Sequence, residues 1–362
     1  MICSLSRRKF IAGTISAMVS SAAGSAPSHQ PELDDKIGQM LMANFAGLRM
    51  PEHVRRLIRD DHLGGVLLFE NNFSTAARPK ESLQKLIAEL QGASSTPLLI
   101  AMDHEGGAVN RLKQKYGFPQ IRSAQECGEQ KDVQLTKMSA ESIAQALSSV
   151  GVNHNFAPVV DLRLNATNPI AADRRCYAAD PDSVIAHARQ FIRAHREKRI
   201  ITTLKHFPGH GSSMGDTHAG YTDVTKTWQA KELRPYERLI AEDMVDSIMT
   251  AHIYQSNLDS VYPASLSHAI ITQLLRQKLG FDGVVISDDL LMAAIRNRYS
   301  LAESVRQAVQ AGNDILLFTT TADDLLPRVK NIIRQHVKDG VISQRRIDES
   351  YKRIARLKDR LA

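Results

Sequence analysis

Cysteines are few in this sequence, and long hydrophobic runs are missing from it. Three of its 362 residues are cysteines, of which Cys127 and Cys176 lie beyond the N-terminal segment. Two thiols cannot form a disulfide framework, and neither belongs to a Cys-x-x-Cys pair of the kind that binds zinc or exchanges disulfides. No apolar run reaches the roughly 18 residues that a transmembrane helix requires. We therefore expect no stable membrane insertion of the mature chain.

A strong excess of one charge is also missing. The chain has 46 lysines and arginines against 39 aspartates and glutamates, which gives a formal net charge of +7. Arg7, Arg8 and Lys9 supply three of these positive charges in a segment that we expect to be removed. The remaining excess forms no basic stripe, so nucleic-acid binding is not predicted. Nucleotide-binding motifs are absent too, because there is no Gly-Lys-Ser/Thr phosphate loop and no Gly-x-Gly-x-x-Gly after the first apolar run.

Residues 1–30 have the features of an export signal. Arg7 and Arg8 stand near the start, a moderately apolar stretch covers residues 11–19, and small residues follow at 20–26. This pattern resembles a twin-arginine signal, which is cleaved after a small residue such as Ala23 or Ala26. We expect a periplasmic or secreted protein. The alternative is that the basic residues begin an amphipathic helix.

Short apolar runs alternate with helical patterns from residue 35 to the C-terminus. Eight such runs separated by helices are typical of a (β/α)8 barrel, whose parallel strands are apolar throughout because both faces are buried. The sequence predicts an α/β protein with a single TIM-like barrel domain over residues 31–362, ending in a helix capped by Ser343. A doubly wound open sheet is the alternative. The predicted strands are Gln39–Phe45, Gly65–Phe69, Leu98–Met102, Gly151–Val160, Ile200–Leu204, Ser247–His252, Gly283–Ile286 and Asp314–Phe318. The predicted helices include Glu81–Gln91, Gln134–Val150, Pro181–Lys198, Ala230–Asp243, Ala269–Leu279 and Ala302–Ala311.

Charged residues gather directly after the predicted strands. The densest group is the loop from Lys205 to His218 after the fifth strand, which combines a lysine, three histidines and an aspartate. Asp103 follows the third strand, and Asp288 follows the seventh. In a barrel the carboxyl ends of all strands share one face, and active sites lie there. Residues distant in sequence should therefore meet at this face.

Two pairs in the loop have spacings with chemical meaning. Asp216 and His218 are two positions apart, and a carboxylate beside an imidazole can fix its tautomer and hold its proton near neutral pH. His206 and His210 have the i, i+4 spacing of a helical zinc site, but the intervening proline and glycine prevent a shared helical face. No metal is predicted.

Structural roles are the alternative for several of these residues. Asp103 has the residue type of a helix cap, and Asp289 is placed to cap a helix that starts at Leu290. Arg175 has the alternative role of a surface ion pair, and Glu105 that of a structural carboxylate. His252 ends the sixth strand and is expected to support the site without acting on the substrate.

The loop from Lys205 to His218 resembles the signature of glycoside hydrolase family 3 β-N-acetylglucosaminidases. It reads Lys-His-Phe-Pro-Gly-His-Gly, four spacer residues and Asp-Thr-His. Further segments match the family in the right order, and together they span most of the chain. They are Asp103–Arg111, Asn155–Asp161, Arg175–Pro181, Met249–His252 and Ser287–Leu290.

The resemblance implies a role for each matching position. Asp288 would be the nucleophile, and His218 the general acid/base with Asp216 as its partner. The sugar hydroxyls would be bound by Asp103, Arg111, Arg175, Lys205 and His206. The sequence departs from the usual residues of the family at His104, Ala108, Asn110, Cys176 and Tyr177. These departures concern specificity at the rim of the site.

These observations predict a retaining exo-β-N-acetylglucosaminidase. Retention needs a carboxylate below the anomeric carbon and a proton donor beside the leaving oxygen, and the resemblance assigns both. An envelope location would place the enzyme among peptidoglycan fragments, and chito-oligosaccharides are a second substrate class. No cofactor is implied, the expected partner is the carbohydrate substrate, and no oligomeric state is predicted. Three alternatives stay open: a metal-dependent hydrolase on the same barrel, an N-acetylglucosaminide phosphorylase and a non-enzymatic sugar-binding protein.

Overall fold

A computed structural model describes residues 31–217, 219–320 and 322–361 of the chain. The predicted export signal at residues 1–30 lies outside this range, as does His218. Residues from Glu32 onward form one compact unit. Within the described residues, no helix is both long and apolar enough to cross a membrane.

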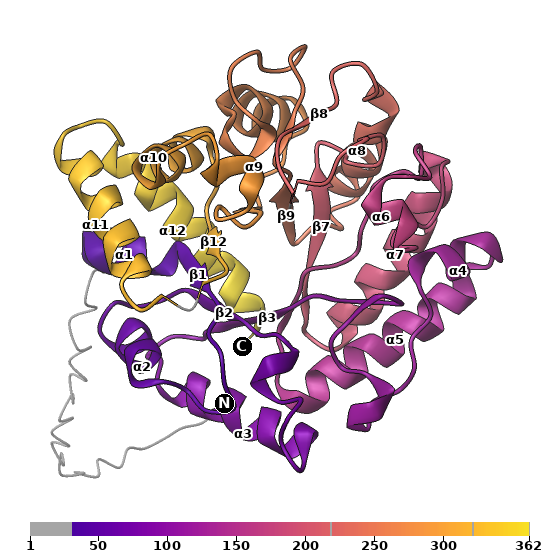
Figure 1. Cartoon of the computed structure of the whole chain (residues 1–362), viewed down its shortest axis with the longest axis horizontal. Coiled ribbons are helices and arrows are strands. Elements are labelled where there is room, and N and C mark those ends of the chain that lie inside the picture. Colours follow the sequence, from indigo (N-terminus) through magenta and orange to yellow (C-terminus); the bar gives the residue numbers. More distant parts are fainter. Residues whose placement is uncertain (1–30, 218, 321, 362) are drawn as a thin grey trace, which may run out of the picture. The chain divides into compact units, whose positions relative to one another are not determined.

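Eight parallel strands form the centre of this unit (Figure 1). Consecutive strands pair side by side, and a parallel bridge between Ile286 and Ile315 joins the last two strands, so that the sheet closes into a barrel. Each strand overlaps one of the eight predicted runs, which confirms the (β/α)8 barrel. The strands are β1 (Leu41–Ala43), β2 (Gly65–Leu67), β3 (Leu99–Met102), β6 (His154–Asn155), β7 (Ile201–Phe207), β9 (Ser247–Thr250), β11 (Val284–Ser287) and β12 (Leu316–Phe318).

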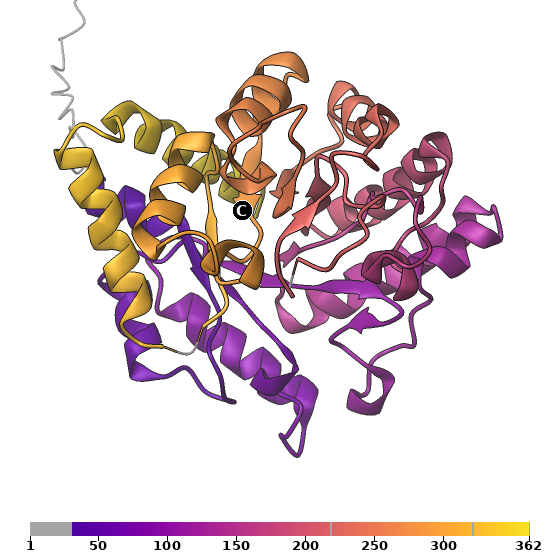
Figure 2. The ribbon, with the colours of Figure 1, turned by 45° about the horizontal axis from the view of Figure 1, so that its top comes forward.

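Helices surround the strands (Figure 2). The α-helices are α1 (Leu33–Gln39), α2 (Glu52–Arg59), α3 (Pro79–Gly92), α4 (Ala124–Glu129), α5 (Val133–Val150), α6 (Pro169–Ala172), α7 (Pro181–Glu197), α8 (Arg234–Ala241), α9 (Ala293–Arg296), α10 (Leu301–Ala311), α11 (Leu325–Lys338) and α12 (Gln344–Lys358). The short 3-10 helices are η1 (Glu70–Asn72), η2 (Gln114–Tyr116), η3 (Ala230–Leu233), η4 (Ala264–Leu266) and η6 (Asp359–Leu361), and η5 (Ala269–Lys278) is a π-helix. Two small ribbons lie outside the barrel sheet: β4 (His104–Gly106) pairs with β5 (Val109–Asn110), and β8 (Thr222–Asp223) pairs with β10 (Ile253–Tyr254).

Local sequence explains where several helices begin. Ser343 caps α12 as predicted, because its hydroxyl accepts the amide hydrogen of Arg346 at 3.2 Å. The helix predicted over residues 230–243 is instead divided into η3 and α8. Pro235 lies in the first turn of α8 and has no amide hydrogen with which to continue the preceding turn. The segment at 269–278 is helical as predicted but has the wider π geometry.

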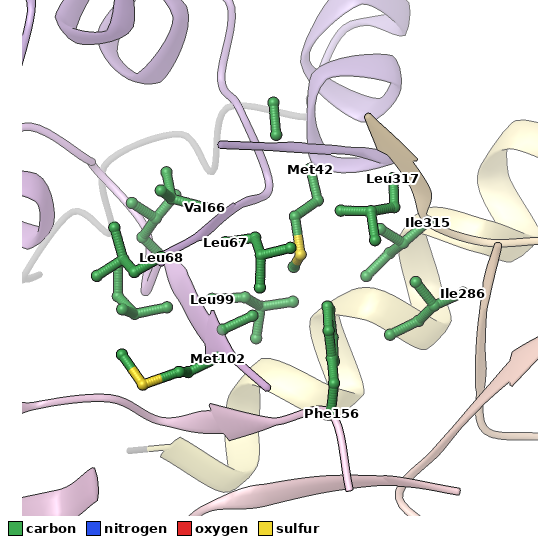
Figure 3. Close-up of a cluster of buried hydrophobic side chains, with 14 of the residues drawn as sticks. Met42, Val66, Leu67, Leu68, Leu99, Met102, Phe156, Ile286, Ile315 and Leu317 are labelled. Atoms are coloured by element: carbon green, nitrogen blue, oxygen red, sulfur yellow. The ribbon is translucent and has the colours of Figure 1, made fainter. Parts of the chain in front are cut away.

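The inside of the barrel is apolar on one side and polar on the other. On the apolar side, hydrophobic side chains converge, among them those of Met42, Leu67, Leu99 and Phe156 (Figure 3). A side chain at Gly65 would crowd this region, since its Cβ would lie 2.4 Å from the terminal carbon of Met42 and 2.9 Å from the backbone oxygen of Leu99.

The polar side of the interior is formed by β6, β7 and β9. The His154 imidazole contacts the hydroxyl groups of Thr203 at 2.8 Å and Ser247 at 3.3 Å. Burial lowers the pKa of His154 to about 3, so this imidazole is neutral. A neutral ring can satisfy the hydroxyl groups without placing a charge inside the barrel.

Candidate active site

Four of the predicted site residues lie at the carboxyl ends of the barrel strands. Asp103 directly follows β3, and Asp288 directly follows β11. Lys205 and His206 belong to β7, which continues to Phe207 with an irregular register against β9. The prediction that the strand ends at Leu204 is therefore wrong. The side chains of Lys205 and His206 find polar partners at this end of the barrel, so the strand can contain them.

Lys205 is the centre of a buried ion-pair network. Its ammonium group lies 2.8 Å from a carboxylate oxygen of Asp103 and 2.7 Å from one of Glu105, and its side chain is only 2% exposed. Burial lowers the pKa of Lys205, but the two carboxylates outweigh this effect and raise it. Lys205 is therefore a permanent cation at the barrel mouth. Asp103 accepts a hydrogen bond from Lys205 and caps no helix, so the alternative role as a helix cap is rejected.

Arg175 completes this network through Glu105. Its guanidinium group donates two parallel hydrogen bonds to the Glu105 carboxylate, both at 2.8 Å. Burial raises the pKa of Glu105, but Arg175 and Lys205 overcome this effect and hold the pKa at about 2. A guanidinium nitrogen of Arg111 lies 4.0 Å from the second carboxylate oxygen of Asp103. The structure thus brings together Asp103, Arg111, Arg175 and Lys205, and Arg175 is paired inside the site and not at the surface.

His206 is oriented by a buried carboxylate that follows β6. Its Nδ1 lies 2.6 Å from Asp161, which also accepts the backbone amides of His206 at 3.2 Å and His210 at 2.8 Å. Burial raises the pKa of Asp161, but His206 and His210 outweigh this effect and lower it below its usual value, so the carboxylate is ionised. An ionised Asp161 accepts the Nδ1 hydrogen and leaves Nε2 of His206 for another partner.

The base of the loop after β7 is held at several points. Glu232 accepts the amide hydrogen of Gly211 at 3.1 Å, and Asn168 donates to the carbonyl of His210 at 2.8 Å. The Trp228 indole donates to the carbonyl of Pro208 at 3.2 Å. These contacts fix the loop from residue 208 to residue 213.

The outer part of the same loop contains the predicted acid/base pair. The carbonyl of Asp216 accepts the amides of Ala219 at 3.0 Å and Gly220 at 3.1 Å, and the carbonyl of Thr217 accepts the amide of Ala294 at 3.3 Å. This last contact joins the loop to α9, which follows Asp288. His218 itself lies outside the described residues, so its distance to Asp216 stays a prediction.

Asp288 and Asp289 at the end of β11 differ in environment. Asp288 is half-buried, and its carboxylate accepts the Asp289 amide at 2.8 Å. Its charge is among those acting on buried His210, whose pKa burial lowers to about 4. Asp289 accepts the amides of Leu291 and Thr319, both at 3.0 Å, and the Thr319 hydroxyl.

Asp289 is therefore structural, but it does not cap a helix at Leu290 as predicted. The Leu290 amide donates to Leu317 of β12 at 3.0 Å, and α9 begins only at Ala293. His252 supports the same turn, as its Nε2 lies 2.8 Å from the carbonyl oxygen of Asp289.

Comparisons with known proteins identify the family of this chain. The model of the glycosyl hydrolase family 3 N-terminal domain matches residues 32–357. The chain belongs to glycoside hydrolase family 3. It is 32% identical to the β-hexosaminidase LpqI of Mycobacterium tuberculosis over 332 residues, which cover 90% of this chain and 82% of that protein.

Two solved structures show the same fold as this family 3 enzyme. A family 3 β-N-acetylglucosaminidase from a Paenibacillus species superimposes with a TM-score of 0.85 and 36% identity, over 91% of this chain and 63% of that one. This chain thus spans less than two thirds of the length of the Paenibacillus protein. A family 3 hydrolase from Mycobacterium smegmatis gives a TM-score of 0.79 and 31% identity, over 90% of this chain and 97% of that one.

Three further residues of this family 3 hydrolase were not assigned to the site from its sequence. They are Glu105, Asp161 and Glu232, which position other groups of the site. Glu105 and Asp161 stand in the matching motifs, but only the fold reveals their partners. Glu232 stands in no motif, and its role is visible only in its contacts with the loop. Among the described residues of this hydrolase, no group of three or more His, Cys, Asp or Glu side chains could hold a metal ion.

Proposed function

We propose that this family 3 hydrolase is a retaining exo-β-N-acetylglucosaminidase that releases terminal N-acetylglucosamine from peptidoglycan fragments or chito-oligosaccharides. The observation that carries the proposal is the buried network of Lys205, Asp103, Glu105 and Arg175 at the barrel face where Asp288 lies. Its relatives include a β-hexosaminidase and a β-N-acetylglucosaminidase.

In the first chemical step, the Asp288 carboxylate attacks the anomeric carbon and forms a glycosyl ester. The bond from that carbon to the leaving oxygen breaks, and His218 donates its proton to this oxygen. In the second step His218 takes a proton from water, the water oxygen attacks the anomeric carbon, and Asp288 leaves as a carboxylate. Two displacements at one carbon give net retention.

Asp216 would serve the acid/base through electrostatics. A carboxylate next to an imidazole stabilises the protonated ring and fixes its orientation. The anchored loop base at residues 208–213 limits the positions that this pair can take.

The charged network would bind the terminal sugar. Lys205 and the arginines donate hydrogen bonds to hydroxyl oxygens, and the Asp103 carboxylate accepts from hydroxyl groups. Because these groups hold one another, they are already in place when the substrate arrives. Such preorganised contacts can become stronger in the transition state and so contribute to turnover.

The N-terminal pattern of Arg7 and Arg8 supports export of the folded enzyme. Replacement of both arginines by lysine should leave the protein in the cytoplasm, as measured by fractionation and immunoblotting. An unchanged periplasmic yield of the double variant would reject this location. Export would bring the enzyme to peptidoglycan, which supports the first substrate class.

One assay tests the proposed reaction against its alternatives. The enzyme should hydrolyse p-nitrophenyl N-acetyl-β-glucosaminide and not the corresponding glucoside. Added phosphate should leave the product as free sugar; appearance of sugar 1-phosphate would indicate the phosphorylase. Loss of activity in chelator, with recovery on adding zinc, would indicate the metal-dependent hydrolase. Absence of turnover with every glycoside tested would indicate a non-enzymatic sugar-binding protein.

A further inference from the structure

Tyrosines gather in the loops that surround the predicted acid/base and nucleophile. The chain has eight tyrosines, and four of them lie in three loops at the carboxyl ends of β7, β9 and β11. They are Tyr221, Tyr254, Tyr262 and Tyr299. Arg298 lies next to Tyr299 and is exposed. The mechanism described above uses none of these side chains.

Tyr221, Tyr254 and Arg298 form a cluster, in which the two rings are tilted by 41°. The guanidinium carbon of Arg298 lies 4.0 Å from the centre of the Tyr221 ring, and the Tyr221 and Tyr254 rings are 5.5 Å apart. Tyr221 is 45% exposed. The hydroxyl of Tyr254 donates to the carbonyl of Ser260, which fixes the second ring. A cation above an aromatic face is attracted by the π electrons of the ring.

The cluster is joined to the catalytic loops by short segments of chain. Tyr221 stands three positions after His218, and β8, which begins at the next residue, pairs with the strand that contains Tyr254. Tyr254 stands two positions after His252, which contacts Asp289. Arg298 follows α9, whose Ala294 binds the loop through Thr217. The cluster therefore lies beside the loop that carries the predicted proton donor.

Within the part of the chain that the structure describes, no salt bridge neutralises the positive charge of Arg298, whereas Arg175 is paired with Glu105. Asp223 of β8, two positions after Tyr221, accepts the amide of Thr225 at 2.8 Å. With its guanidinium carbon over the Tyr221 ring, Arg298 can still present its N–H groups to the two oxygens of a carboxylate.

We propose that Tyr221, Tyr254 and Arg298 form a subsite for a leaving group that carries a carboxylate. The rings would contact the sugar next to the cleaved bond, and Arg298 would bind the acidic substituent on that sugar. This inference rests on the proposed function and specifies its substrate class. It predicts a preference for acidic over neutral leaving groups.

Three disaccharides with the same terminal N-acetylglucosamine test the subsite. The first has N-acetylmuramic acid with a free lactyl carboxylate, the second is its neutral methyl ester, and the third is neutral chitobiose. Arg298→Gln should raise KM for the acid about tenfold, the loss expected for a hydrogen bond between charged groups. KM for the ester and for chitobiose should change less than twofold, and kcat should stay within twofold. A peptide-bearing muropeptide shows whether a stem-peptide carboxylate can replace the lactyl group.

Arg296→Gln is the matched control, since Arg296 is also exposed and lies two positions away at the end of α9. It should leave all KM values unchanged. Tyr221→Leu should raise KM for every disaccharide but not for the aryl glycoside, since it removes the ring contact. The preference of the parent for the acid should shrink with added salt.

Equal KM values for acid and ester in the parent, or equal effects of Arg298→Gln on both, would overturn the subsite. Either result leaves the proposed reaction intact if chitobiose and the aryl glycoside are still hydrolysed. Failure to hydrolyse any of these glycosides would instead reject the proposed function itself.

Discussion

Two adjacent aspartates at the end of β11 should respond differently to the same substitution. Asp288→Ala should lower kcat by several powers of ten with little change in unfolding free energy, because it removes the nucleophile. Asp289→Ala should lower the free energy of unfolding by about 1–3 kcal/mol, because the amides of Leu291 and Thr319 lose their acceptor. Aryl-glycoside kinetics and urea unfolding measure the two effects. A near-normal kcat for Asp288→Ala would contradict the assignment of Asp288 as the nucleophile.

The effect of removing His218 should depend on how much the leaving group needs a proton. A good leaving group needs little protonation, so His218→Ala should impair natural disaccharides far more than aryl glycosides with acidic phenols. Asp216→Ala should show the same pattern more weakly, because it removes only the partner. A plot of log kcat/KM against leaving-group pKa should be steeper for both variants than for the parent. Equal impairment on all substrates would contradict the role of a proton donor.

At the scale of single elements, the loop anchor Glu232 should make stability depend on pH. Burial raises the pKa of Glu232 from 4.5 to about 7, so the folded state holds a proton that the unfolded chain has lost. The contribution of Glu232 to the free energy of unfolding should therefore fall as the pH rises through this window and level off above it, whereas the buried neutral imidazoles of His154 and His210 contribute with the opposite sign. The total change is on the order of 3 kcal/mol, since one pKa unit corresponds to about 1.4 kcal/mol.

Glu232→Gln should remove this contribution, so its free energy of unfolding relative to that of the parent should rise with pH, as followed by urea unfolding at several pH values between 4.5 and 8. Glu237→Gln is the matched control, since Glu237 is an exposed carboxylate on α8. It should keep the slope of the parent. A Glu232→Gln variant with the parental slope would show that the anchor is ionised throughout.

The barrel strands could be predicted because each is buried on both faces and is mostly apolar. The hairpin of β4 and β5 could not, since it contains His104 and Glu105, whose residue types argue against a buried strand. Glu105 is buried because Arg175 and Lys205, from distant parts of the sequence, neutralise it. Neither contact is visible in a local pattern.

The site motifs located most of the predicted residues but not their local structure. Lys205 and His206 were expected in a loop and lie in β7, because carboxylates from two other strand ends satisfy them. Asp289 was expected to cap a helix, but Thr319, 30 positions away, is its partner. Tertiary contacts thus overrode the local signals in each case.

At the scale of the whole molecule, α12 is held to the base of the barrel by a buried carboxylate. Asp314 is fully buried and lies 3.0 Å from Arg346 of α12 and 2.6 Å from Arg276 of η5. Arg346→Ala should lower the free energy of unfolding by about 2–3 kcal/mol, the value for a hydrogen bond to a charged group. Two other arginines continue to neutralise Asp314 and limit the loss.

Arg345→Ala is the control for this contact. Arg345 is adjacent in sequence, but its side chain is 88% exposed, and its salt bridge to Glu349 lies on the surface. Its loss should change the free energy of unfolding by no more than about 0.5 kcal/mol. Urea unfolding of both variants measures the difference. Equal losses would mean that α12 is held by its apolar face alone.

The central claim is that turnover passes through a glycosyl ester on Asp288. A slowly reacting fluorinated N-acetylglucosaminyl fluoride should accumulate this ester, and mass spectrometry of a tryptic digest locates it. Cleavage after Lys278 and Arg296 places Asp288 in the peptide Leu279–Arg296, and fragmentation distinguishes it from Asp282 and Asp289. The account predicts one added sugar on Asp288, absent from the Asp288→Ala variant. A sugar on any other residue, or turnover of the reagent by the Asp288→Ala variant at the parental rate, would contradict it.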